Sequence, residues 1–399
     1  MAKRAESVAP DRFIPTTFEE LSPEFLSASL VEAGVLTTGR VRERRIEIIG
    51  EGIGFAGRVA RIHLDYVDAN DEGPTTLIAK LPSRVKKNRA TVEIVNGYER
   101  EVCFFRELAG RSELPVPGCY YAEMDEDPFY EQRPTVQRCI EHLPVAVLRM
   151  LLPVSLFFVR FSKRRYLVLM EDLAPAENGD QIAGCDLAQA QQAVRNLATF
   201  HASYWADDSL CEKIWLPSID TMPRGVMAVH RRSRRSFFRE HGDAIPPEMK
   251  EACRWMDGHF ESVVRHLTSP PWTVLHGDYR LDNLLFDGAS MWATDFQIVA
   301  RGRPGFDLAY FICGSVDPSV DERLIVDAYC DELRRQGVAD YSRAECERDC
   351  ALSKLWQIYL HVATDDLLDL GEERGARLIE VGRERLFSRI PIPPYDSLL

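Results

Sequence analysis

The sequence has no cysteine pair at the Cys-x2-Cys spacing of zinc ribbons and redox motifs, although it contains ten cysteines in 399 residues. The closest pair, Cys346 and Cys350, has the spacing of one helical face. His361, the nearest downstream histidine, has no partner at ligand spacing, which argues against a zinc site. Free cysteines scattered along a chain are typical of a reducing compartment, so we predict a cytoplasmic protein.

Long uninterrupted apolar runs are also missing. The first sixteen residues have no apolar core and carry charged residues such as Lys3 and Glu6, so we expect no signal peptide. The apolar stretch Leu143–Val159 has only 17 residues and contains Arg149 and two prolines, which is too short and interrupted for a stable transmembrane helix. We favour an insertion packed over a cleft and keep an interfacial membrane helix as the alternative.

Positive charge is scarce, with 49 lysines and arginines against 62 acidic residues and a net charge of −13. Such an acidic chain argues against a nucleic-acid partner. Apolar residues make up 45% and charged residues 28%, which is ordinary for a soluble globular protein. The length of 399 residues allows two domains or two lobes with a sizeable core, and no motif indicates an oligomeric state.

Residues 273–297 predict a β-hairpin, because an Asp-Gly dipeptide lies between two short apolar runs. If Phe286 pairs with Met291 across that turn, counting back along both strands places Asn283 beside Thr294 and Asp295. An amide oxygen and a carboxylate at one spot are ligands that Mg²⁺ takes together with substrate phosphates. The register therefore predicts a metal site.

Asp278 lies on the loop that leads into this hairpin, five residues before Asn283, where it is free to face a third component. Aspartate and asparagine are also common turn residues, so this spacing alone is weak evidence for a site.

The full stretch is more specific. His276-Gly277-Asp278 with Asn283, followed by Asp295-Phe296-Gln297, resembles the aminoglycoside phosphotransferase and choline kinase superfamily, especially its ecdysteroid-kinase-like branch. It is more distantly similar to the His-Arg-Asp-x4-Asn loop and Asp-Phe-Gly segment of protein kinases, from which Gly277 and Gln297 depart.

The resemblance implies an α+β, protein-kinase-like fold of two lobes. Residues 1–171 would form a small β-rich N-terminal lobe with one αC-type helix, which also holds the apolar insertion. Residues 172–399 would form a larger, mostly helical C-terminal lobe that carries the loop at 276–283 and the metal segment at 295–297.

A glycine pattern precedes these motifs. Gly52, Gly54 and Gly57 match the Gly-x-Gly-x-x-Gly spacing, which dinucleotide-binding folds also use. Residues 60–64 then alternate between apolar and polar, which predicts a strand where a dinucleotide site needs a helix. We interpret the glycines as a loop that covers nucleotide phosphates and keep a plain glycine-rich hairpin as the alternative.

Lys80 lies inside a short apolar strand and resembles the kinase lysine that reaches the α- and β-phosphates. An edge lysine that extends to solvent would look the same, so an acidic partner is needed to separate the two. An amphipathic helix over residues 98–108 offers two, of which Glu101 is our choice and Glu99 the second.

Three further segments follow the order expected from the resemblance. The buried strand that ends near Glu171 and Leu173 resembles the hinge where adenine pairs with backbone groups. His201 is interpreted as a packed structural histidine rather than a base. Asp307 resembles the aspartate that braces the catalytic loop.

Six arginines lie between residues 224 and 239. One interpretation is a solvated helix face, as charge runs usually are. The other is an anion-binding wall for an acceptor that carries a phosphate or carboxylate, with Arg231 and Arg235 as contacts.

Together, the resemblance implies an ATP- and Mg²⁺-dependent kinase that phosphorylates a hydroxyl of a small organic acceptor. Asp278 would orient and deprotonate that hydroxyl, His276 would fix the loop, and Asn283 and Asp295 would hold Mg²⁺. A nucleotide-binding regulatory pseudokinase is the alternative from another class. The acceptor is not identified, since lipophilic, anionic and cationic molecules each match one feature of the chain.

Overall fold

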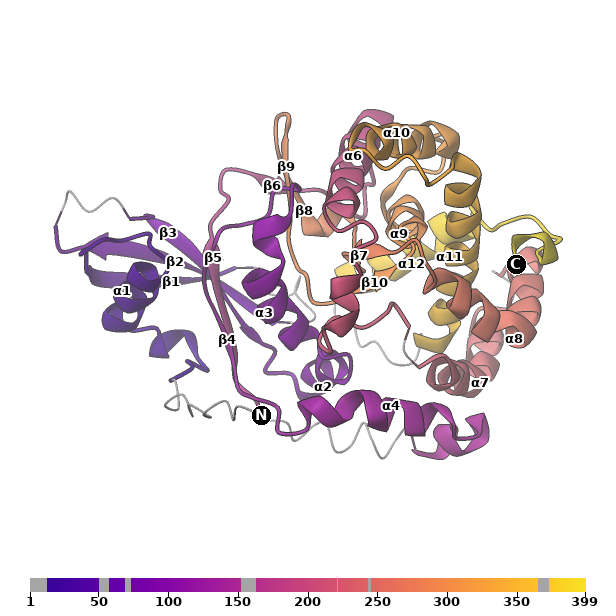
Figure 1. Cartoon of the computed structure of the whole chain (residues 1–399), viewed down its shortest axis with the longest axis horizontal. Coiled ribbons are helices and arrows are strands. Elements are labelled where there is room, and N and C mark those ends of the chain that lie inside the picture. Colours follow the sequence, from indigo (N-terminus) through magenta and orange to yellow (C-terminus); the bar gives the residue numbers. More distant parts are fainter. Residues whose placement is uncertain are drawn as a thin grey trace, which may run out of the picture.

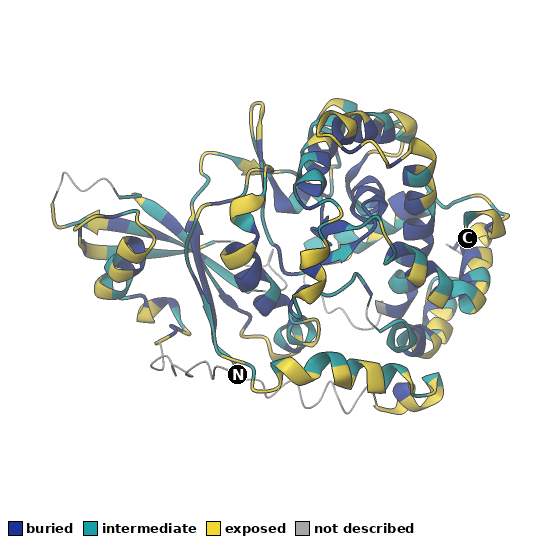
Figure 2. Cartoon of the chain, viewed as in Figure 1, coloured by how far each residue is buried: buried dark blue, intermediate teal, exposed yellow. Residues whose placement is uncertain are grey.

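The computed structural model describes residues 13–49, 57–68, 73–151, 163–220, 222–242, 245–364 and 373–399. They form a small lobe built on an antiparallel sheet and a larger lobe made mostly of helices (Figure 1). Buried residues gather where the helices face one another and on the sheet (Figure 2). The predicted α+β fold of two lobes is confirmed.

The sheet of the small lobe has five antiparallel strands in the order β1-β2-β3-β5-β4. The elements of this lobe are α1 (Pro23–Glu32), β1 (Val41–Ile49), β2 (Gly57–Tyr66), β3 (Thr76–Pro82), α2 (Lys86–Ile94), α3 (Gly97–Glu107), β4 (Cys119–Met124), α4 (Arg133–Glu141) and β5 (Tyr166–Glu171). In β5, Leu167 and Leu169 belong to the core shared with α1, whereas Val168 and Met170 belong to the core shared with α3. Because both faces are covered, β5 is a continuous apolar run.

Strand β2 has the predicted period of two. Ala60, Ile62 and Leu64 are buried, and the intervening side chains are more exposed. A strand therefore follows the glycine pattern, which excludes the helix that a dinucleotide-binding fold places there.

The larger lobe packs its helices around α11, which contacts α7, α8 and α9. Two small sheets, β6-β8-β9 and β10-β7, lie where this lobe meets the other. The elements are β6 (Glu177–Asn178), α6 (Leu187–Ser203), α7 (Pro223–Glu240), α8 (Pro247–Leu267), β7 (Thr273–Leu275), β8 (Leu284–Asp287), β9 (Ser290–Ala293), β10 (Ala300–Gly302), α9 (Gly305–Ser315), α10 (Glu322–Arg335), α11 (Arg343–Thr364) and α12 (Glu373–Phe387).

The insertion after β4 joins the two lobes. Its helix α4 runs beneath them and contacts α7, and Glu141 Oε2 accepts a 3.1 Å hydrogen bond from the Arg224 amide near the first turn of α7 (Figure 1). Residues 152–162, in the apolar stretch of the insertion, lie outside the described residues.

Glu99 anchors this insertion to α3. Arg133 donates two hydrogen bonds to its carboxylate, at 2.6 and 2.7 Å, and Arg164 adds a third at 3.1 Å. The Glu99 side chain is 0% exposed, so its charge is stabilised by these two guanidinium groups. The sequence identified Glu99 only as a second candidate partner for Lys80, because the two arginines are 34 and 65 residues away.

Glu99→Gln should therefore destabilise the protein by about 3 kcal/mol, the low end of the cost of breaking a buried ion pair, because Arg133 keeps Asp127 as a partner. Urea denaturation measures the loss. Glu107→Gln is the control on the same helix, since its pair with Lys213 is partly exposed and should contribute under about 1 kcal/mol. Equal losses in the two variants would show that Glu99 does not anchor the insertion.

Candidate active site

The hairpin forms in the predicted register. Phe286 pairs with Met291, and Leu284 pairs with Ala293. The Thr294 amide donates to the Asn283 carbonyl over 2.9 Å, so the next residue, Asp295, lies beside Asn283. Asp295 has a φ of +66°, a region that costs energy for a residue with a Cβ atom. With this backbone conformation, the Asp295 carboxylate lies 2.8 Å from Lys80 of the small lobe.

Asp278 is held by three donors. The Tyr310 hydroxyl donates to Oδ1 over 2.8 Å, while Arg280 Nε and Asn283 Nδ2 donate to Oδ2 over 3.1 and 2.9 Å. The sequence analysis missed Arg280 and Tyr310. A signal for Tyr310 was its place one helical turn after Asp307, which puts both side chains on the same face of α9.

Charge and burial fix the protonation of this cluster. Burial raises the pKa of Tyr310 well above 10, and the Asp278 carboxylate raises it further, so the hydroxyl stays a donor. Burial lowers the pKa of Arg280, but Asp278 and the other acidic neighbours outweigh it and the net pKa rises. Arg280 also donates to Asp282 Oδ2 over 3.0 Å, so one guanidinium bridges two carboxylates of the loop.

Asp307 supports the loop from below, as the resemblance implied. Its carboxylate accepts hydrogen bonds from the backbone amides of His276 and Gly277, at 2.6 and 2.9 Å. Gly277 has a φ of +81°, and a Cβ atom there would lie 2.3 Å from the Ile298 carbonyl oxygen, so only glycine fits. His201 is fully buried between Tyr329 and Asp307, as expected of a structural histidine.

His276 links the loop to the metal segment. Its Nε2 contacts the Thr294 carbonyl at 3.0 Å, and its Nδ1 accepts from the Asp278 amide at 3.3 Å. Phe296 packs beside the imidazole and stacks on Phe104 of α3, with ring centroids 3.8 Å apart. Both ring nitrogens of His276 therefore contact backbone atoms, one of Thr294 and one of Asp278.

Lys80 lies between two carboxylates. Its Nζ is 2.7 Å from Glu101 Oε1 and 2.8 Å from Asp295 Oδ1. Of the two candidates on α3, Glu99 and Glu101, it is thus Glu101 that contacts Lys80. Gln297 donates to Glu101 Oε2 over 3.1 Å, which gives a structural reason for the glutamine where protein kinases have glycine.

The electrostatics of Lys80 and its two carboxylates, Glu101 and Asp295, favour a charged lysine. Burial lowers the pKa of Lys80, but Asp295 and Glu101 outweigh burial, and the net pKa lies above its usual value. Burial raises the pKa of Asp295, and Lys80 lowers it by more, so the carboxylate stays ionised.

The expected nucleotide-covering residues are described in part. Gly52 and Gly54 lie outside the described residues. Gly57 begins β2, and a Cβ atom there would lie 3.0 Å from the Leu81 carbonyl oxygen and 3.6 Å from Lys80 Cε. A glycine at this position therefore lets β2 approach the strand that carries Lys80.

Glu171 and Leu173 lie where β5 leaves the small lobe, at the expected hinge. The Glu171 carboxylate accepts from the Gly118 amide over 3.0 Å. Between them, Asp172 binds Arg61 of β2 through two hydrogen bonds at 2.5 and 3.2 Å, a pair that the sequence analysis missed. This pair ties β2 to the segment that follows β5.

The arginines of α7 lie away from this cluster. Arg231 and Arg235 are exposed, and Arg234 pairs with Asp257 of α8. Within the described residues, the contacts of α7 run to α4, α8 and α11, and none joins Arg231 or Arg235 to Asp278.

Two oxygen atoms beside the loop fit a hard cation. The described hydrogen bonds of Asn283 use its Nδ2, and that of Asp295 uses Oδ1, so Asn283 Oδ1 and Asp295 Oδ2 have no hydrogen-bond partner among the described residues. The described residues contain no group of three or more His, Cys, Asp or Glu side chains that could hold a metal. A divalent ion at this spot therefore needs further oxygens from a bound phosphate.

The model of the ecdysteroid kinase-like family matches residues 51–337 of the chain. No curated protein matches it. The matched segment runs from the glycine pattern through the hairpin and α9 to α10, and so contains the contacts of Lys80, Asp278, Asp295 and Asp307 described above.

Solved structures of similar shape are distant in sequence. A putative aminoglycoside phosphotransferase from Ralstonia eutropha is 14% identical, with 92% of this chain and 96% of that chain covered and a TM-score of 0.47. An amicoumacin kinase is 12% identical (95% and 98% covered, TM-score 0.47), and choline kinase from Cryptosporidium parvum is 9% identical (86% and 87% covered, TM-score 0.47).

Likenesses this distant establish no function. Among the described helices, none combines the length and the apolar character that crossing a membrane requires. The family match covers well over half of the sequence, and the chain therefore belongs to the ecdysteroid kinase-like family.

Proposed function

We propose that this protein is an ATP-dependent small-molecule kinase that transfers the γ-phosphate to a hydroxyl group of a small organic acceptor. The observation that carries the proposal is one set of contacts around the hairpin. Lys80 contacts Glu101 and Asp295, the neighbouring Thr294 amide donates to the Asn283 carbonyl, and Asn283 donates to Asp278. Phosphoryl transfer asks the protein mainly to position groups and to stabilise charge, and this set contains the groups for both tasks.

Asp278 is the proposed base. Tyr310, Arg280 and Asn283 hold its two oxygens, which fixes the direction in which the carboxylate accepts a proton. The side chain keeps 23% exposure, so an acceptor hydroxyl can reach it. Orientation of the hydroxyl by a fixed carboxylate also reduces the entropic cost of the transfer.

Lys80 is the proposed contact to the α- and β-phosphates, with Glu101 as its support. In the described structure its Nζ is shared with Asp295, so phosphate oxygens would replace or join that carboxylate as acceptors. Asn283 and Asp295 would hold Mg²⁺, which would neutralise charge on the β- and γ-phosphates.

A regulatory pseudokinase is disfavoured because the chain keeps Asp278 and the two proposed metal ligands, Asn283 and Asp295, which a protein that only binds nucleotide would not need together. Single-turnover ATP consumption with a panel of alcohols separates the two functions. The panel should include an aminoglycoside, choline, a steroid alcohol and a hydroxyacyl thioester, and mass spectrometry of a ligand that co-purifies would narrow it. ATP binding without consumption for every alcohol would favour the pseudokinase.

Asp278→Asn should lower turnover by roughly 10²–10⁴-fold, the usual contribution of a general base, while ATP affinity is nearly unchanged. Steady-state kinetics and ATP titration measure the two effects. Asp287→Asn, at the exposed hairpin turn, is the matched control and should leave both unchanged. A parallel loss of ATP affinity in Asp278→Asn would reassign the residue to the metal.

Asp295→Ala should abolish Mg²⁺-dependent ATP binding, because a magnesium site with two protein ligands depends on its one carboxylate. Calorimetric titration with ATP in the presence and absence of Mg²⁺ tests this expectation. Unchanged affinity for Mg·ATP would contradict the assignment of the metal to the hairpin.

Arg231→Ala and Arg235→Ala should each change stability by under about 0.5 kcal/mol, as exposed substitutions do. If the acceptor is anionic and these arginines bind it, acceptor KM should rise about tenfold to over a hundredfold, the cost of a lost charge-assisted bond. The KM for ATP should stay unchanged. Lysine replacements at the two positions should restore only part of the affinity for the acceptor. Arg254→Ala, exposed on α8, is the control. If the acceptor is cationic and its KM is unchanged in both variants, the arginines do not bind the acceptor.

A further inference from the structure

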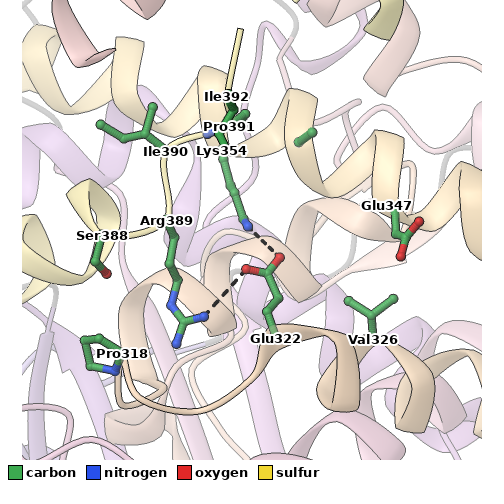
Figure 3. A pocket seen from close by; sticks show the side chains of 11 residues that line it. Pro318, Glu322, Val326, Glu347, Lys354, Ser388, Arg389, Ile390, Pro391 and Ile392 are labelled. Carbon is green, nitrogen blue, oxygen red and sulfur yellow. Dashed lines mark hydrogen bonds and ion pairs between the residues drawn. The ribbon is translucent and has the colours of Figure 1, made fainter. Parts of the chain in front are cut away.

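A cavity of about 370 Å³ lies in the larger lobe between α10, α11 and the C-terminal segment (Figure 3). Its volume is within the range of small-molecule sites. The lining shares no residue with the cluster around Asp278 and Lys80. The lining residues are Pro318, Glu322, Val326, Glu347, Ala351, Lys354, Ser388, Arg389, Ile390, Pro391 and Ile392.

Two cations meet on one carboxylate inside this cavity. Lys354 Nζ lies 2.5 Å from Glu322 Oε1, and Arg389 Nη1 lies 3.6 Å from Glu322 Oε2 (Figure 3). The side chains of Lys354 and Arg389 are 8% and 6% exposed. Each of the two cationic side chains is thus more than nine-tenths buried. The two positive charges share a single carboxylate, that of Glu322.

Both cations keep donors that this carboxylate does not use. An ammonium group has three donors, and the described hydrogen bond of Lys354 is the one to Glu322. Arg389 donates to the Asp317 carbonyl over 2.8 Å, yet its buried Nε has no hydrogen-bond partner among the described residues. Buried donors are normally satisfied, so an oxyanion that accepts from both cations would complete the site.

The other charged group of the lining is at the rim. Glu347 is exposed and has its own partner, since Arg343 Nε lies 3.2 Å from its carboxylate. The remaining wall is largely apolar, with Val326 on α10, Ala351 on α11, and Ile390 and Pro391 on the C-terminal segment. An oxyanion at the cations would therefore place the rest of a ligand against aliphatic side chains.

We propose that this cavity binds a small organic anion, with a carboxylate or phosphate on Lys354 and Arg389 and a short apolar body against α10 and the C-terminal segment. Glu322 acts as the internal acceptor that holds the two cations in place and competes with the ligand for them. The site is separate from the proposed phosphoryl-transfer centre and does not depend on that function.

Calorimetric titration of the full-length chain at constant ionic strength tests the site with four probes. Hexyl phosphate and hexanoate should bind, inorganic phosphate should bind more weakly because it leaves the apolar wall unused, and hexanol should not bind. Binding of only one of the two hexyl anions would identify the headgroup. Equal affinity for hexanol and for both hexyl anions, or no binding of any anion, would overturn the proposal.

Lys354→Met keeps the aliphatic stem and removes the charge, and it should weaken anion binding by roughly ten- to a hundredfold, the usual effect of a lost charge-assisted bond. Arg348→Met, exposed on the same helix, is the matched control and should bind as the parent does. Unchanged binding in Lys354→Met would place the anion elsewhere, such as at Lys80, and would overturn the assignment.

Glu322→Gln is a second test of the anion site, and it can be carried out even if Lys354→Met does not fold. Removing the competing carboxylate should lower the melting temperature and tighten hexyl phosphate binding, and saturating hexyl phosphate should restore the melting temperature. A lower melting temperature without tighter binding would show that the three residues only fasten the C-terminal segment, and it would overturn the proposal.

Discussion

The buried ammonium group of Lys80 is the constraint on which the rest of the site depends. A lysine in the interior of a sheet must keep carboxylates within hydrogen-bond reach, or its charge becomes too costly to bury. Here the carboxylates come from α3 and from the segment after the hairpin, 21 and 215 residues along the chain. One charge therefore fixes the helix, the sheet and the larger lobe relative to one another, and the stacking of Phe296 on Phe104 supports the same contact with apolar surface.

A buried charged side chain also fixes the loop that carries Asp278. Asp307, fully buried on α9, accepts from two successive backbone amides, which is possible because Gly277 adopts a positive φ. The two bonds occupy both oxygens of the Asp307 carboxylate and so fix the backbone of the loop. Tyr310, one turn further along α9, reaches the Asp278 carboxylate itself. A single short helix thus sets both the backbone of the loop and the direction of its proposed base.

Patterns of short range were readable from the sequence, and pairs of long range were not. The two short apolar runs on either side of an Asp-Gly turn predicted the register of Phe286 with Met291, and motif order predicted the two lobes. The anchors of Glu99 and the Arg61–Asp172 pair join residues 34 to 111 positions apart, and which of these charges meet after folding is not encoded by spacing. Gly52 and Gly54 lie outside the described residues, so their proposed role still rests on the motif.

Two of the acids of α3 bind different partners. Glu99 and Glu101 are two residues apart, which places them about 200° apart around a helix of 3.6 residues per turn. Glu101 faces Lys80, whereas Glu99 faces Arg133 and Arg164 of the insertion. The insertion in turn contacts α7 through α4. Helix α3 therefore connects the insertion to Lys80 through two carboxylates on different sides of the helix. Its eight buried residues and its contacts with β4 and β5 hold the helix in place between these two sets of partners.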